Sequence, residues 1–252
     1  MEKERAPDPV RLAVAVHKPY PIPEDPLYFP VQAGAALHDR LPFQGDDTGD
    51  QISARNDLYC ELTVLYWAWK NLPAEALGLC HYRRYFQEPG QKCPLTLASA
   101  RAVLSRTPVI LPKKRNYWIE TGESQFVHAH GAASLEALRS VLRDGFPEYL
   151  PAFDRSMSRT SGHRFNMLLM RRDLLDDYCS WLFAVLFKTE KRLNPPPARI
   201  MGFLSERLLD AWVETKQLPC AELPVYYTER TNWVRKGGIF LMRKFRGSIY
   251  PR

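Results

Sequence analysis

Apolar and polar positions follow one another in blocks that predict short buried strands. Residues 11–17, RLAVAVH, form an apolar run that ends in the proline-rich segment HKPYPIPEDP, which is typical of a buried strand entering a loop. Residues 76–80, ALGLC, and residues 108–111 predict two further buried strands. A fourth is predicted over 163–170, HRFNMLLM, with Asn166 inside it.

Four other segments repeat their apolar residues every three or four positions, which predicts helices with one buried face. The predicted helices cover residues 57–72, 135–145, 173–193 and 199–216. Pro73 ends the first predicted helix, and the prolines at 195–197 separate the last two, because proline does not fit a helix interior. Asn56 or Asp57 is expected to cap the first helix.

Strands that alternate with helices predict an α/β domain with a mostly parallel central sheet. Ligands of such sheets bind beyond the carboxyl ends of the strands, so His17 and His81 are expected to converge on one cleft. We expect a single domain over residues 1–224, followed by a basic and apolar extension over residues 225–252.

Composition indicates an ordinary folded protein rather than a disordered, membrane-spanning or disulfide-linked one. Of the 252 residues, 45% are hydrophobic and 25% are charged, with no apolar run of membrane-spanning length. The start, MEKERAPDPVRL, lacks the apolar region of a secretory signal, so a cytoplasmic location is expected. The five cysteines contain no CxxC pair, which favours reduced thiols over a disulfide framework or a zinc cluster.

Positive charge is concentrated in the last 28 residues. Seven basic residues and one acid, Glu229, give residues 225–252 a charge of +6 out of a total of +7. Basic residues interleaved with apolar ones suit contact with the anionic inner face of a membrane, and a packed terminal element explains them equally well. The nearly neutral remainder, with its clustered aromatic and acidic residues, argues against nucleic acid as a partner.

Several blocks in combination resemble one protein family. They are HKPY, VQAGAAL, DDTGD, ISARN, ELTVLYWAWKN, LGLCHYRRYF, LPKKRNYWIE, RFNMLLM and GFLSERL, spread over residues 10–236. They resemble the bacterial capsular-polysaccharide synthesis proteins that include galactofuranosyltransferases. The resemblance implies a GT-A-like fold and the inverting transfer of a sugar, with UDP-galactofuranose as the expected donor. The implied acceptor is a lipid-linked or growing capsule, O-antigen or exopolysaccharide glycan.

A different class of function stays open beside the transferase. A non-catalytic subunit of a polysaccharide assembly complex would bind a nucleotide sugar or a glycan with the same pocket, but it would lack the base.

The motif HYRR stands where many GT-A enzymes carry a metal-binding DxD motif. His81, Arg83 and Arg84 are therefore candidates to bind the donor diphosphate, since guanidinium groups match phosphate oxygens. The alternative is that the arginines form structural ion pairs. A divalent cation, Mg or Mn, is an open possibility, and the loop with Asp46, Asp47 and Asp50 could bind it, bind acceptor hydroxyls or form an ordinary turn.

Glu206 is the candidate general base, with Asp50 as its rival. On the predicted helix 199–216, Arg199, Glu206 and Asp210 form a narrow polar stripe, which can face a cleft or a solvent edge.

The remaining candidates bind the donor or the acceptor. Glu61 and Lys70 are expected to be largely solvated, and the HAH motif at 128–130 is too sparse to indicate zinc. Further donor-binding candidates are His17, Lys18, Asp47, Asn56 and Asn166, and acceptor-binding candidates are Tyr66, Lys70, His128 and His130.

Overall fold

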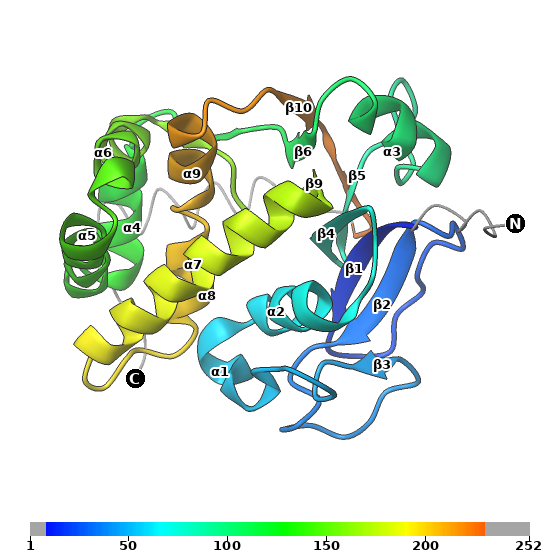
Figure 1. Ribbon diagram of the computed structural model, residues 1–252, viewed down its shortest axis with the longest axis horizontal. Coiled ribbons are helices and arrows are strands. Elements are labelled where there is room, and N and C mark those ends of the chain that lie inside the picture. The colour runs from blue at the N-terminus through cyan, green and yellow to red at the C-terminus, as the bar shows by residue number, and fades with distance from the viewer. Residues whose placement is uncertain (1–8, 230–252) are drawn as a thin grey trace, which may run out of the picture.

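The computed structural model describes residues 9–229, which form an α/β fold around a nine-stranded sheet (Figure 1). The main path of the sheet runs β10-β6-β9-β4-β1-β2-β3, and β5 joins β4 to β11 at one side. Only β9 among the strands of the main path runs antiparallel to its neighbours, so the prediction of a mostly parallel sheet is confirmed. The strands of this sheet are β1 (Val10–Val16), β2 (Tyr28–Gln32), β3 (Gln44–Gly45), β4 (Ala76–His81), β5 (Arg84–Phe86), β6 (Val109–Pro112), β9 (Leu168–Arg171), β10 (Cys220–Leu223) and β11 (Val225–Tyr227).

Helices cover the sheet and extend it sideways. Helices α2 and α7 cross the front of the sheet in Figure 1, and α4, α5 and α6 gather beside it. Strands β7 (Arg115–Asn116) and β8 (Ser161–Gly162) form a separate two-stranded ribbon. The helices are α1 (Asn56–Tyr59), α2 (Leu62–Asn71), α3 (Leu97–Leu104), α4 (Gly122–His130), α5 (Ala133–Gly145), α6 (Leu150–Ser158), α7 (Arg172–Arg192), α8 (Ile200–Ser205) and α9 (Leu209–Thr215). Within residues 9–229, no helix has the length and apolar character needed to cross a bilayer.

Alternation along the strands divides the core into two clusters, one on each face of the sheet. On β1, Ala13 and Ala15 pack with α2 and α7, whereas Leu12 and Val14 pack with β5 and α3. Successive side chains of a strand point to opposite faces, so one buried strand supplies both cores. This explains why β1 reads as an unbroken apolar run in the sequence.

The predicted strand over 163–170 is wrong in its first half. Strand β9 begins only at Leu168, and Asn166 lies before it. Phe165 and Asn166 have positive φ angles of 78° and 52°, which lie in the left-handed region and do not continue a strand.

The predicted helix over 57–72 is interrupted at Cys60, whose φ of 53° separates α1 from α2. Neither Asn56 nor Asp57 caps it, because the residue before α1 is Arg55. The side chain of Asn56 instead donates to the Cys60 carbonyl (2.8 Å) and the Thr63 hydroxyl (3.1 Å), and so bridges the interruption.

The predicted helix over 199–216 is also two helices, α8 and α9, with Glu206 at the carboxyl end of the first. The expected polar stripe is therefore not one surface. Asp210 turns inward and accepts hydrogen bonds from His163 Nδ1 (2.5 Å) and the Arg164 guanidinium (3.2 Å).

Strand β11 follows the expected domain boundary at residue 224 and pairs antiparallel with β5. The rest of the expected basic extension, residues 230–252, lies outside the described part of the chain.

Candidate functional site

The HYRR motif forms a two-residue hairpin at the carboxyl end of β4. His81 pairs with Arg84 across the β4–β5 ladder, so Tyr82 and Arg83 are the connecting residues. Cross-strand partners place their side chains on one face of the sheet, within contact distance. Burial first, and then the positive charges of Arg84 and Arg83, together lower the pKa of His81 to about 3. His81 is therefore a neutral ring beside a guanidinium at neutral pH.

His17, at the end of β1, meets this hairpin as the sequence predicted. Its ring centroid lies 5.8 Å from that of His81, and its Nε2 atom lies 3.2 Å from the Tyr82 hydroxyl. Lys18 extends the same surface, with its amine 5.7 Å from the centre of the Tyr82 ring. Partial burial lowers the pKa of His17, and the nearby cations Arg83, Lys18 and Arg199 add to this effect.

Arg84 and Arg115 converge on the ring of Phe165. Their guanidinium carbons lie 4.7 Å and 6.0 Å from the ring centroid, which is the geometry of cation–π contacts. Among the residues from 9 to 229, neither guanidinium has a carboxylate within ion-pair distance, whereas Arg83 lies 3.7 Å from Glu229. The hairpin thus presents cationic groups that residues 9–229 do not fully neutralise.

Two carboxylates, Glu61 and Glu206, bind the Phe165–Asn166 segment. Glu206 accepts a hydrogen bond from the Phe165 amide (3.2 Å), and Glu61 accepts one from the Asn166 side chain (2.8 Å). Burial raises the pKa of Glu61; the Asn166 hydrogen bond and Arg84 oppose this shift, whereas the charge of Glu206 adds to it. Glu61, Glu206 and Arg84 therefore share one electrostatic environment.

The acidic loop does not join these groups. Asp46 is buried and accepts hydrogen bonds from the Gly34 amide, the Ala35 amide and the Ser53 hydroxyl, at 2.5–2.9 Å. Asp47 is held by both nitrogens of Arg40. Each carboxylate is thus bonded to its own part of the loop rather than directed toward a common centre.

Asp50 meets Tyr66 and Lys70, the two acceptor-binding candidates on α2. The Tyr66 hydroxyl donates to Asp50 (3.1 Å), and the Lys70 amine lies 3.9 Å from it. The Asp50 amide also binds Asn71, the last residue of α2. A ten-residue helix spans about 15 Å, so Asp50 sits near one end of α2 and Glu61 at the other. The structure does not bring Glu206 and Asp50 together.

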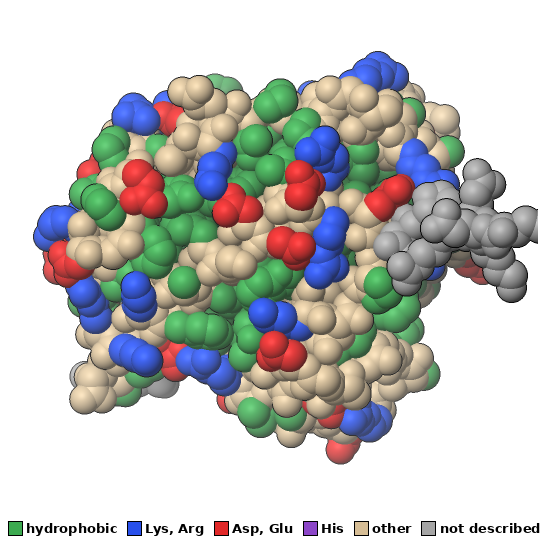
Figure 2. Space-filling model, viewed as in Figure 1, with side chains coloured by type: hydrophobic (Ala, Val, Ile, Leu, Met, Phe, Trp, Pro, Cys, Tyr) green, Lys and Arg blue, Asp and Glu red, His purple; other side chains and the backbone are tan. Residues whose placement is uncertain are grey.

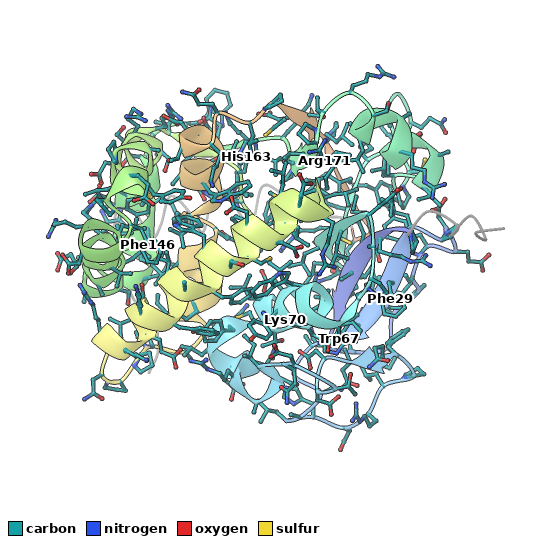
Figure 3. The ribbon with its side chains drawn as sticks, viewed as in Figure 1. Phe29, Trp67, Lys70, Phe146, His163 and Arg171 are labelled. Carbon is teal, nitrogen blue, oxygen red and sulfur yellow. The ribbon has the colours of Figure 1, made fainter. Side chains whose placement is uncertain are left out.

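Figure 3 shows Lys70 and Trp67 on α2, where they accompany this second group. The Trp67 indole donates to Thr48 (2.9 Å), so it secures the acidic loop rather than stacking on a ligand. Figure 2 shows basic and acidic side chains interspersed over the α2 and α7 face, without a continuous patch of one sign.

The two histidines of the HAH motif point to different neighbours. The ring of His128 lies 2.5 Å from the buried carboxylate of Glu120. The ring of His130 stacks on Phe203 of α8, with 4.1 Å between centroids. His130 thus packs against the helix that ends at Glu206, and His128 does not share its contacts.

Side chains suited to hold a metal do not gather in the described structure. Across residues 9–229, no set of three or more His, Cys, Asp or Glu side chains is arranged to bind an ion. Two surface hollows of about 460 and 440 Å³ lie elsewhere, one beside Arg55 and Glu190 and the other beside Glu75 and Arg101.

Sequence reasoning did not place Glu61 or Phe165 in the cluster. Glu61 sits in a helical pattern as an ordinary polar residue, and only the interruption at Cys60 turns it inward. The basic run at 113–115 follows a predicted strand and is open in the sequence to two interpretations, a solvated turn or a second phosphate contact; the structure brings Arg115 of this run to the cluster.

Comparison with known proteins places this geometry in a structural class. The fold is GT-A-like, and it matches the apo structure of WbbM, a bifunctional glycosyltransferase, with a TM-score of 0.79 and 25% identity. The match covers 88% of this chain and 46% of that one, so the chain spans about half of WbbM. No curated protein matches the sequence. The family model described as "Domain of unknown function (DUF4422)" matches residues 11–217, and the chain belongs to that family.

Proposed function

We propose that this protein is a glycosyltransferase that moves a sugar from a nucleotide sugar onto a glycan. The observation that carries the proposal is the cationic hairpin His81–Arg84 at the end of β4, whose Arg84 contacts the Phe165 ring, together with Glu61 and Glu206, which bind the Phe165–Asn166 segment. The cations match the leaving diphosphate and the carboxylates match the acceptor proton, which are the two charges that the reaction must stabilise. The similarity to a bifunctional glycosyltransferase supports the same class.

The leaving diphosphate is stabilised by protein cations in this proposal. Arg84 and Arg83 supply forked donors that fit phosphate oxygens, and Lys18 supplies a point charge beside them. The neutral rings of His17 and His81 add hydrogen bonds. A divalent cation is therefore expected to have a weak effect on turnover.

Glu206 acts as the general base. It takes the proton from an acceptor hydroxyl as that oxygen bonds to the anomeric carbon, and the bond from this carbon to the diphosphate breaks. Attack from the face opposite the leaving group inverts the anomeric centre. The Phe165 amide and the half-buried position of Glu206 hold the carboxylate in place for this role.

The expected donor is UDP-galactofuranose, and the expected acceptor is a lipid-linked or growing glycan of a capsule, O-antigen or exopolysaccharide. These finer assignments rest on the sequence resemblance to capsular-polysaccharide synthesis proteins. The basic residues after position 229 suit work at the inner face of a membrane, where such acceptors are carried.

A donor screen tests the proposal. The purified protein is incubated with a panel of UDP-sugars that includes UDP-galactofuranose, with a synthetic acceptor, and released UDP is measured with and without EDTA. Release that depends on acceptor and resists EDTA is the expected result. Failure with every UDP-sugar overturns the transferase, and donor binding without transfer to any acceptor indicates the binding-subunit alternative.

A further inference from the structure

Three segments that are distant in sequence meet at the side chain of Asn166. Its Nδ2 atom donates to Glu61 (2.8 Å) and to the Gly202 carbonyl (3.0 Å), and its Oδ1 atom accepts from the Ser205 hydroxyl (2.7 Å). Asn166 is buried, so these bonds replace the ones it would make with water. All of its amide atoms are therefore committed to protein partners.

The position of Glu61 follows from the interruption between α1 and α2. The left-handed backbone at Cys60 turns Glu61 out of the helical row, and Gly202 of α8 packs closely against Cys60. A side-chain carbon at residue 202 would lie 3.2 Å from the Cys60 Cβ atom. This close approach lets α8 and Glu61 bind the same amide.

Asn166 is the second of two left-handed residues, and the first is Phe165. Phenylalanine adopts this backbone only when the surroundings hold it there, at a cost of about 1–3 kcal/mol, whereas asparagine tolerates it more readily. The amide of Phe165 binds Glu206, and its ring carries the Arg84 guanidinium. These two residues thus link the proposed base to the cationic hairpin.

We propose that Glu61 is a positioning residue of the active site. By accepting the Asn166 amide hydrogen, it holds the Phe165–Asn166 backbone in its left-handed form, and this backbone places Glu206. The inference deepens the proposed function and depends on it for the activity readout only. Glu61 itself need not touch either substrate.

A double-mutant cycle tests the inference through turnover. Glu61→Ala removes the acceptor of the Asn166 amide and is expected to lower kcat about 100-fold, the effect of misplacing a reacting group by about 1 Å. Glu61→Gln keeps an acceptor oxygen and is expected to restore kcat to within about threefold of the wild-type value. In a Glu206→Gln background, Glu61→Ala is expected to add less than about threefold, because both act on one group. Glu136→Ala, at an exposed position of α5, is the matched control.

Two turnover results overturn the inference. The first is Glu61→Gln as impaired as Glu61→Ala, which makes the charge of Glu61 the important property. The second is a full multiplicative loss in the double variant, which makes Glu61 and Glu206 independent.

Amide hydrogen exchange tests the same inference without any reaction. The Phe165 amide is expected to exchange at least about tenfold faster in Glu61→Ala than in the wild type, because its hydrogen bond to Glu206 opens more often. Glu61→Gln and Glu136→Ala are expected to keep the wild-type rate. Unchanged exchange in Glu61→Ala overturns the inference even if transfer is observed, and faster exchange supports it even if every UDP-sugar fails.

Discussion

The acidic loop and the Glu61–Glu206 pair hold similar carboxylates in different situations. In the loop, Asp46 and Asp47 are bonded to local partners within 12 residues of themselves. In the pair, each carboxylate accepts a hydrogen bond from the Phe165–Asn166 segment, Arg84 acts on the charge of Glu61, and Glu206 also lies 3.4 Å from the Arg207 guanidinium. The loop carboxylates thus stabilise their own loop, whereas Glu61 and Glu206 connect segments that are distant in sequence.

The sharpest way to break this comparison is to neutralise one carboxylate from each region. Glu206→Gln is expected to lower turnover by about 10²–10⁴-fold, because it removes the group that accepts the acceptor proton, while UDP binding persists. Asp50→Asn is expected to change turnover by less than about threefold. Steady-state kinetics and calorimetric UDP titration measure both effects. A larger loss for Asp50→Asn would move the base to the acidic loop.

The cations beside the pair give the next largest effect. Arg84→Ala is expected to weaken UDP binding by about 10–100-fold, and Arg84→Lys is expected to recover only part of it, because lysine lacks the planar fork that stacks on Phe165. Arg106→Ala, at an exposed position after α3, is the control and should leave the affinity unchanged. Equal affinity of Arg84→Ala and wild type would place the diphosphate elsewhere.

Substitutions in the acidic loop are expected to lower stability rather than activity. Asp46→Asn is expected to lower the free energy of unfolding by about 3 kcal/mol, because its amide group would face donors that now bind a carboxylate. Asp47→Asn breaks a partly exposed ion pair and should cost less than about 1 kcal/mol. Urea unfolding measures both, and the comparison fails if the two costs are reversed.

The smallest effect concerns pH and the neutral histidine of the hairpin. The pKa of His81 is about 3 in the folded chain and 6.5 in the unfolded one, so the unfolded state binds more protons between these values. Stability is therefore expected to fall as pH drops below 6.5. His81→Gln should make this slope shallower by up to about 1.4 kcal/mol per pH unit. Urea unfolding of both proteins at pH 7 and pH 5 measures how the free energy of unfolding depends on pH. The same pH dependence in His81→Gln and in the wild type would contradict a neutral His81.

Hydrophobic patterning predicted β1, β4, β6 and the mostly parallel sheet correctly, because apolar runs report burial directly. Strand β1, strand β4 and helix α5 lie where the pattern placed them. The meeting of His17 with His81 was also predictable, since both follow parallel strands.

The interruptions in the backbone were not predictable. Cys60, Phe165 and Asn166 take left-handed conformations, and neither cysteine nor phenylalanine signals such a turn in the sequence. The pattern therefore extended one helix through Cys60 and one strand through Asn166. The role of Glu61 was not predicted for the same reason, because its inward direction depends on the interruption of the helix at Cys60, which tertiary contacts impose.

The hydrogen bonds around Asn166 also determine when the proposed active site can form during synthesis. Asn166 binds Glu61 across 105 residues and Gly202 across 36, and Phe165 binds Glu206 across 41. A nascent chain that has emerged only as far as α7 already contains β1, β4 and β9, yet it lacks Gly202 and Glu206. Sheet formation can begin on the ribosome, whereas the catalytic arrangement must wait for the last fifth of the chain. A chain truncated before residue 200 should accordingly contain most of its strands but lack Glu206, the proposed general base.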